Sequence, residues 1–416
     1  MITVRMAATL AAITLGATLT LAQTPTIAPL RTRPIEKFTV NPGHRDWQAT
    51  VIAGATIIGG NSSNRGGLFG VDLATGTLKW TFRPTGTASG NPFVATKPAV
   101  AGNVVMAPMG NTLVAATIAT GREAWRGPRT AQSAAVATDG ALAFVLGEDA
   151  NFHALDTATG KEKWAVSFPT RGSCRSRPVA LRGAVYVTRN VLVRAADASR
   201  AAEYSQHLVA LDANTGEERW RYPAAPAGNQ GMCVEEATVS GDAYFAVAHE
   251  TLHAINLTTG RDIWPPVPVR APIEGRDRLV GLAGLVDAGD ILVGVTRVAL
   301  MAFDKTTGRL AWQLPGQYSQ DNPSTAAAGG VLYVQGHPGA KPASEVQDRI
   351  VYQGGKPVET VRALPLGVLN AIDLATHSVL WTFSRPTAEA NWPFGYVTPV
   401  DGGLWVDSYQ ALIKLQ

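Results

Sequence analysis

Two histidines and a glutamate lie close together near the middle of the chain, where residues His249 to His253 read H-E-T-L-H. On a helix, H-E-x-x-H places both imidazoles on one face, where they bind zinc while the glutamate acts as a general base. Here the preceding residues, Tyr244 to Ala248, alternate as a strand does, and the motif falls across a predicted hairpin. Residues four apart converge only on a helix. We therefore expect neither a zinc site nor hydrolase chemistry here.

Basic residues form two local clusters. The first contains Arg171, Arg175 and Arg177, and the second contains Arg270, Arg276 and Arg278. Solvated loops explain such clusters by default, and a rim that binds a partner is the alternative that concerns function. The formal net charge of +4 is too small to indicate nucleic-acid binding. The sequence has no glycine-rich phosphate loop and no G-x-S-x-G elbow.

The element that would position these residues is an internal repeat. Seven times an apolar stretch runs into a tight turn and then a tryptophan: Trp80, Trp125, Trp164, Trp220, Trp264, Trp312 and Trp381. By subtraction they lie 45, 39, 56, 44, 48 and 69 residues apart. Such a period, with alternating apolar residues, is typical of propeller blades. Glycine, which adopts positive φ, ends six of the turns; His377 ends the seventh, which must be strained or differently shaped.

An eighth unit lacks its last strand. Eight apolar runs precede the hairpins, and the last leads to Tyr409–Leu415, where the sequence stops short of another turn and tryptophan. Residues 34–40 would supply the missing strand, with Phe38 in or near the tryptophan position. We therefore predict an all-β fold, an eight-bladed β-propeller of four-stranded antiparallel blades, with the ring closed by an N-terminal strand.

The N-terminal 22 residues resemble a secretory signal peptide. One arginine, Arg5, precedes an uncharged apolar stretch from Met6 to Ala22 that ends in small residues. An uncleaved anchor is the alternative. We expect a signal peptide at 1–22 and one domain at 23–416, exported to the periplasm or another extracytoplasmic space. With 42 glycines and 46% hydrophobic residues, the chain has ample turns and core for one domain.

Cys174 and Cys233 are the only cysteines. Both fall at the predicted entrance to the innermost strands of consecutive blades. In an oxidising compartment an even number of cysteines favours a disulfide between them. Two small buried thiols are the alternative.

The repeat, a strand followed by D-x-x-T-G, three residues and tryptophan, resembles the pyrroloquinoline quinone (PQQ) propeller repeat family. In that family the tryptophans dock neighbouring blades. One branch contains quinoprotein dehydrogenases, which bind the quinone and calcium, often under a ring of vicinal cysteines that this chain lacks. The other is non-catalytic and includes the BamB-type propeller of outer-membrane protein assembly. A lipid-anchoring cysteine typical of that subunit is missing here.

Two long connections indicate where a partner would bind. Both join a second and a third blade strand, within 188–207 and 336–367, and leave the ring on one face with the cysteines and the first arginine cluster. The second connection could also be tolerated disorder. We expect an exported, non-catalytic scaffold without cofactor or metal, a monomer within a larger complex. Its partners would be proteins of the cell envelope, with no nucleic acid and no membrane span. A PQQ- or small-ligand-binding oxidoreductase is the alternative.

Overall fold

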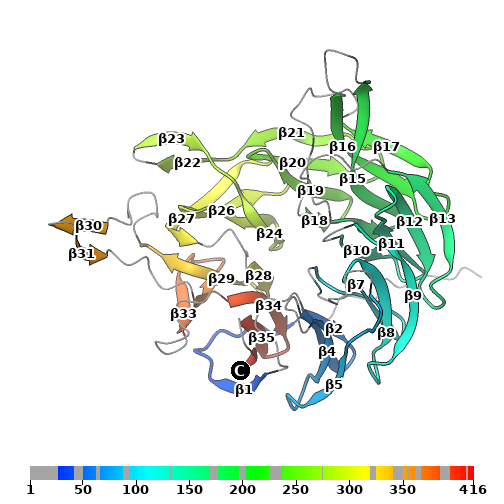
Figure 1. The fold of residues 1–416 in the computed structure, drawn as a ribbon. Coiled ribbons are helices and arrows are strands. Elements are labelled where there is room, and N and C mark those ends of the chain that lie inside the picture. Colours follow the sequence, from blue (N-terminus) through cyan, green and yellow to red (C-terminus); the bar gives the residue numbers. More distant parts are fainter. Residues whose placement is uncertain are drawn as a thin grey trace, which may run out of the picture.

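Strands make up all of the helix and strand structure in the described part of the chain. The computed structural model describes residues 27–41, 50–61, 66–87, 94, 96–131, 134–168, 177–195, 203–223, 232, 234, 237–273, 275–318, 325–340, 350–353, 356–360, 367–384, 394–408 and 411–416. Within these ranges there is no helix. The strands follow one another around a common centre in chain order (Figure 1). The predicted signal peptide lies outside these ranges.

The repeating unit is a sheet of four antiparallel strands that are adjacent in the chain. The first five units are β2 (Thr50–Ala53), β3 (Thr56–Asn61), β4 (Gly67–Asp72) and β5 (Leu78–Phe82); β6 (Ala99–Ala101), β7 (Val104–Met109), β8 (Thr112–Thr117) and β9 (Glu123–Arg129); β10 (Val136–Thr138), β11 (Leu142–Leu146), β12 (Asn151–Asp156) and β13 (Glu162–Ser167); β14 (Val179–Leu181), β15 (Ala184–Arg194), β16 (Glu203–Asp212) and β17 (Glu218–Tyr222); and β18 (Ala237–Ser240), β19 (Ala243–Ala248), β20 (Thr251–Asn256) and β21 (Asp262–Pro268).

Three further units complete the arrangement. They are β24 (Ala283–Asp287), β25 (Ile291–Val295), β26 (Ala299–Asp304) and β27 (Leu310–Tyr318); β28 (Thr325–Ala328), β29 (Val331–Pro338), β32 (Val368–Asp373) and β33 (Val379–Ser384); and β34 (Phe394–Val400), β35 (Gly403–Ser408) and β36 (Leu412–Leu415) with β1 (Glu36–Val40). Pairing of β27 with β29 joins two of these units into one larger sheet. The predicted all-β propeller of four-stranded antiparallel blades is confirmed.

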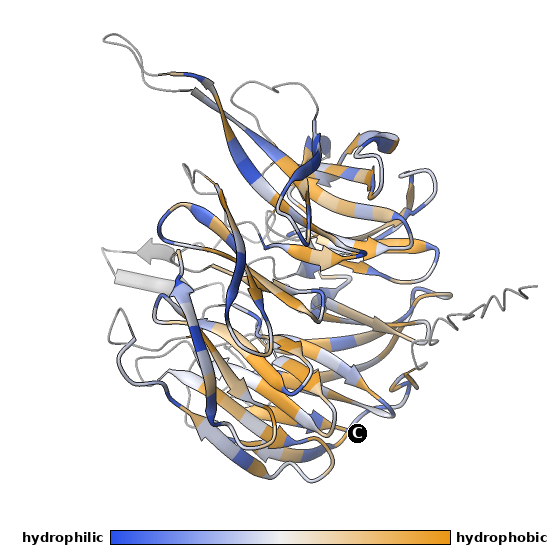
Figure 2. Ribbon diagram, turned by 90° about the vertical axis from the view of Figure 1, so that its right-hand side faces the viewer, coloured by the Kyte–Doolittle hydropathy of each residue, from blue (hydrophilic) through white to orange (hydrophobic). Residues whose placement is uncertain are grey.

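The N-terminal strand β1 belongs to the last unit. It pairs antiparallel with β36, Phe38 opposite Lys414 and Val40 opposite Leu412. The last unit also packs against the first, because Val40 and Trp405 share a buried cluster with Ile57 and Phe69. These contacts join the N-terminal strand to the last unit and the last unit to the first. The apolar residues concentrate along the strands, where neighbouring units meet (Figure 2).

The repeated tryptophans contact the next unit along the chain. Five indole Nε1–H groups each donate to a backbone carbonyl in a turn of the next unit, that of the second turn residue. The pairs are Trp80 to Ile118, Trp125 to Thr157, Trp164 to Ala213, Trp220 to Leu257 and Trp264 to Lys305, over 2.8 to 3.1 Å. The glycine of the same turn lies against the indole ring; a Cβ added at Gly121 would come within 2.6 Å of Trp80. Each turn therefore recognises the preceding tryptophan through both a hydrogen bond and a close backbone approach.

The seventh turn keeps the shape of the others although it lacks glycine. His377 has φ of 59°, close to the 65° of Gly121, and its N–H donates to Asp373 O over 2.8 Å. Of the two alternatives for this turn, the strained one is therefore observed. The His377 ring lies on Trp312, with centroids 4.4 Å apart. Here the contact that glycine makes elsewhere is replaced by ring packing.

Strand β1 substitutes for the missing eighth tryptophan strand. Phe38 lies against Gly76 of the first unit, where an added Cβ would meet its ring within 2.9 Å. The residue paired with each tryptophan in the other units is glycine or alanine, as in Ala254 opposite Trp264. In the last unit this position is Lys414, opposite the smaller Phe38 and over the Trp405 ring at 5.6 Å. A long side chain thus fills the volume that the larger indole occupies elsewhere.

Replacing Lys414 by methionine is expected to remove one pH dependence of stability. Desolvation, with repulsion from Lys37, lowers the pKa of Lys414 from 10.5 to about 8 in the folded chain. Between these values the unfolded chain binds more protons than the folded chain, so the free energy of unfolding should rise with pH through this window. Methionine keeps the apolar stem without the charge. Urea unfolding at about pH 7 and about pH 9.5 should show the rise in the parent only; parallel profiles for both proteins would contradict this assignment.

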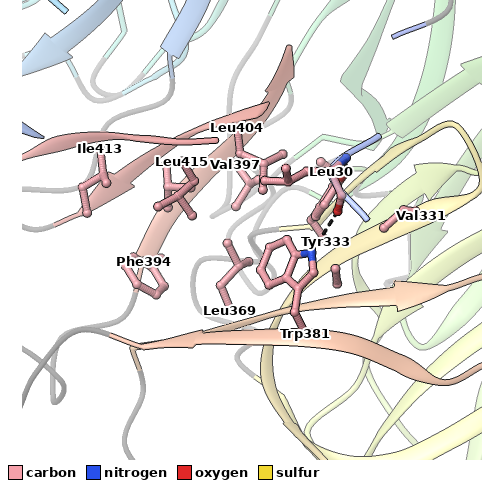
Figure 3. Packing of buried hydrophobic residues seen from close by; sticks show 13 residues of the cluster. Leu30, Val331, Tyr333, Leu369, Trp381, Phe394, Val397, Leu404, Ile413 and Leu415 are labelled. Carbon is pink, nitrogen blue, oxygen red and sulfur yellow. Dashed lines mark hydrogen bonds between the residues drawn. The ribbon is translucent and has the colours of Figure 1, made fainter. Parts of the chain in front are cut away.

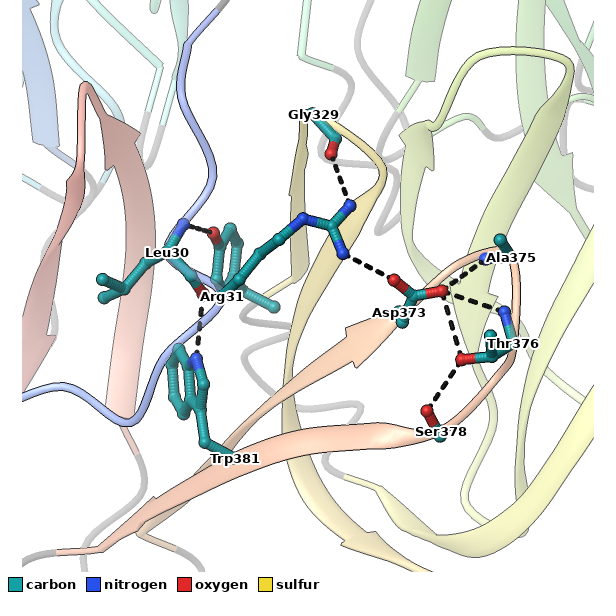
Figure 4. Close-up of polar contacts among 9 residues, drawn as sticks. Leu30, Arg31, Gly329, Asp373, Ala375, Thr376, Ser378 and Trp381 are labelled. Atoms are coloured by element: carbon teal, nitrogen blue, oxygen red, sulfur yellow. Dashed lines mark hydrogen bonds and ion pairs between the residues drawn. The ribbon is translucent and has the colours of Figure 1, made fainter.

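A short segment before β1 fills the place of the absent eighth turn. Trp381 Nε1 donates to Leu30 O over 2.9 Å, and Leu30 N donates to the Tyr333 hydroxyl over 2.7 Å (Figure 4). The Leu30 side chain joins a buried cluster with Tyr333, Trp381 and Leu404 (Figure 3). The N-terminal segment therefore gives Trp381 the backbone acceptor that a turn of the next unit gives five of the other tryptophans.

An ion pair holds the same segment to the seventh turn. Arg31 Nη1 donates to Asp373 Oδ2 over 2.6 Å, and Arg31 Nη2 donates to Gly329 O over 3.3 Å (Figure 4). The guanidinium, with backbone donors of the turn, lowers the pKa of Asp373 to about 2. The Arg31 side chain is 50% exposed, so we assign the ion pair mainly to orientation of the segment and only in small part to stability.

Candidate interaction face

Three hairpins extend beyond the blades at one end of the ring. They are the outer parts of β15 and β16; the separate pair β22 (Arg270–Ile273) and β23 (Arg276–Leu279); and the separate pair β30 (Ile350–Gln353) and β31 (Lys356–Thr360) (Figure 1). Because strands alternate in direction, second-to-third connections and connections between blades leave at the same end. We call this end the hairpin face. The Asp-x-x-Thr-Gly turns lie at the opposite end, which we call the turn end.

Both predicted loop expansions contain strands. The connection within 188–207 continues the blade ladder, with Leu192 paired to Tyr204. Within 336–367, β30 and β31 form a hairpin with Tyr352 opposite Pro357. The described parts of these segments are therefore built as β-ribbons.

The first predicted arginine cluster is only partly described. Arg177 is exposed and lies just before β14. Its charge acts on Lys97, which lies just before β6: desolvation first, and Arg177 second, lower the pKa of Lys97. Two cations from different blades are therefore close enough to repel each other where inner strands begin.

The other two arginines of the first cluster, Arg171 and Arg175, lie outside the described residues. So do Cys174 and Cys233. A disulfide between the two cysteines stays a prediction, as does the role of this cluster as a rim. Met232 and Val234, on either side of Cys233, are both buried.

The second arginine cluster forms a hairpin that sequence reasoning left as a connection. Arg270, Arg276 and Arg278 are exposed on β22 and β23. Arg270 Nη1 lies 3.3 Å from Asp277 Oδ2, with both side chains at least half exposed. The available signal was a Glu-Gly pair between two short runs. Glycine suits a two-residue hairpin loop, but Glu-Gly is a weaker signal than Asn-Gly or Asp-Gly.

The longest hairpin is anchored at its base by Arg189 of β15. Its guanidinium donates to Ser167 O over 2.9 Å, lies 3.3 Å from Glu218 Oε2 and covers the Phe168 ring at 5.5 Å. The neighbouring His207 is buried, with Nδ1 at 2.7 Å from Pro223 O. These contacts fix the direction in which the hairpin leaves the blade.

The H-E-T-L-H segment forms no helix. β19 ends at Ala248, β20 begins at Thr251, and His249 and Glu250 form the turn with φ of 47° and 58°. Desolvation lowers the pKa of His253 to about 4. Its Nδ1 lies 3.2 Å from the Tyr222 hydroxyl, which donates to Asp262 over 2.7 Å. The two histidines therefore serve a turn and a contact between blades.

No group of three or more His, Cys, Asp or Glu side chains in the described ranges is arranged to hold a metal ion. No helix that could span a bilayer occurs in the described part of the chain.

The fold and the repeat define an all-β propeller with PQQ-like repeats. A family model described as outer membrane protein assembly factor BamB matches residues 31–145, 129–272 and 204–357. Since the matched regions cover well over half of the chain, the chain belongs to this family. The resemblance inferred from the repeat is thereby confirmed.

Individual relatives are more distant. BamB from Moraxella catarrhalis superimposes with a TM-score of 0.59 at 15% identity, over 92% of this chain and 98% of that structure. A quinohemoprotein alcohol dehydrogenase from Comamonas testosteroni gives 0.59 at 13% identity, over 93% and 78%. These likenesses show the fold alone. The serine/threonine-protein kinase AfsK of Streptomyces griseus is 29% identical over 171 residues, 40% of this chain but only 18% of the kinase.

Proposed function

We propose that this protein is an exported, non-catalytic scaffold that binds protein partners in the cell envelope, in the assembly of outer-membrane proteins. The observation that carries the proposal is the family match, which spans most of the described ring. A rigid ring with three added hairpins on one face supports it, because additions to a scaffold are where binding surfaces usually arise. The mature chain would be the domain at 23–416, a monomer within a larger complex.

A PQQ-dependent oxidoreductase is the second candidate, favoured by the likeness to the alcohol dehydrogenase. Among the described residues there is no group of three or more His, Cys, Asp or Glu side chains that could hold a metal ion.

In-cell crosslinking followed by purification of the mature chain tests the scaffold function. We expect an outer-membrane assembly component to be recovered with the parent, and its yield to fall at least about tenfold when Arg171, Arg175 and Arg177 are all changed to Ala. The matched control changes Arg122, Arg261 and Arg309, which lie on the turn end, and should leave the yield unchanged. Recovery of no envelope protein, together with saturable binding of PQQ and calcium, would replace the scaffold with the second candidate.

A further inference from the structure

The hairpin of β22 and β23 has no partner sheet among the described residues. Its strands pair only with each other, from Arg270 opposite Leu279 to Ile273 opposite Arg276. All four residues of β23 are exposed. A two-stranded ribbon leaves one edge of each strand open to another chain.

The backbone hydrogen bonds of the hairpin show which of its two strands has every outward N–H group in place. Val280 N donates to Val269 O over 3.0 Å at the base of the hairpin. Because bonded and non-bonded pairs alternate in an antiparallel ladder, Asp277 and Leu279 direct their N–H and C=O groups away from β22. The corresponding outward position on β22 is Pro272, which has no N–H. Only β23 therefore offers an uninterrupted edge.

The two faces of β23 differ in chemistry. Directly paired residues share a face, so Arg276 and Arg278 lie on one face with Ile273. Leu279 and Asp277 lie on the other. Leu279 is 48% exposed, and Asp277 is already paired with Arg270. A strand added to this edge would meet positive charge on one side and an apolar side chain on the other.

We propose that the free edge of β23 binds an extended segment of a partner protein in which acidic and apolar residues alternate. The acidic side chains lie beside Arg276 and Arg278, the apolar ones beside Leu279, and the backbone pairs with Asp277 and Leu279. This inference rests on the proposed scaffold function, because it gives the chemistry of a partner for one part of the hairpin face. The competing explanation is that the arginines only protect an exposed edge from pairing.

Binding of a defined peptide to the full mature chain tests the proposal. The probe is a fluorescein-labelled peptide of about eight residues that alternates glutamate and valine, and its binding is followed by fluorescence anisotropy. A peptide alternating lysine and valine is the matched probe and should not bind. We expect Arg276→Glu with Arg278→Glu to weaken binding at least about tenfold. Arg261→Glu with Arg309→Glu, which makes the same charge change on the turn end, should leave it unchanged.

A second pair of variants separates strand addition from charge attraction. Asp277→Pro removes an outward N–H together with an acidic charge, whereas Asp277→Ala removes only the charge. We expect the alanine variant to bind at least as tightly as the parent and the proline variant at least about fivefold more weakly. Equal binding by both variants would overturn strand addition, and binding unaffected by the arginine changes would overturn the acidic partner. Neither result bears on crosslinking through the first arginine cluster, so failure here is distinguishable from failure of the scaffold.

Discussion

Replacing Trp264 by alanine is expected to lower the free energy of unfolding by about 3–5 kcal/mol. The indole is 5% exposed, stacks with Phe245 at 6.4 Å and donates to Lys305 O of the next unit. Truncation creates a cavity between two blades and leaves the Lys305 carbonyl without this donor. Urea unfolding followed by circular dichroism measures the change.

The neighbouring residue on the same strand provides the control. Ile263 is 43% exposed, so Ile263→Ala should cost less than about 1 kcal/mol. Losses of similar size for the two variants would show that strand β21, and not the contact between blades, determines the cost.

Replacing Gly121 by alanine should be the second severe change, with a loss of about 2–4 kcal/mol. Two costs add: the left-handed backbone at φ of 65° strains any side chain, and the new Cβ would lie 2.6 Å from the Trp80 ring. Trp80 cannot withdraw freely, because its Nε1 is bound to Ile118 O of the same turn. Thermal and urea unfolding of the variant measure the sum.

Gly102→Ala separates the two costs. Gly102 has φ of 54° and no atom within 4 Å of an added Cβ. This variant should therefore lose only about 1–2 kcal/mol from backbone strain. If both alanine variants lose the same amount, the close approach of the turn to the tryptophan contributes nothing.

The repeat made much of the fold predictable. Seven tryptophans and six turn glycines identify the strands around them. The incomplete last repeat indicated that a strand such as β1 must complete it, with Phe38 in the tryptophan position. This worked because each blade repeats the same local contact, so a pattern along the chain reports a pattern in space.

Other features depend on contacts that no local pattern reveals. Lys414 occupies the position that is glycine or alanine in the other blades. It can do so because its cross-strand partner, Phe38, is smaller than tryptophan, and this partner is far away in the chain. The seventh turn was left open because His377 could be accommodated by strain or by a new shape. The β22–β23 hairpin was missed because Glu-Gly is a weak signal beside the length of the connection.

The site was less predictable than the fold. The rejection of H-E-x-x-H as a zinc motif rested on strand alternation, and the turn at His249 and Glu250 agrees with it. Which arginines contact a partner depends on how the hairpins project, and the sequence shows their composition but not their direction.

The pairing of β1 with the last strand has a consequence for the order of synthesis. Lys37 and Gln416, which share a hydrogen bond, are separated by 379 positions. During synthesis from the N-terminus, Phe38 and Val40 must wait without their strand partners Lys414 and Leu412 until β36 has been made. Such late, long-range pairing is slow and leaves apolar strands open to capture. The nascent chain should therefore depend on holding chaperones until β36 is released.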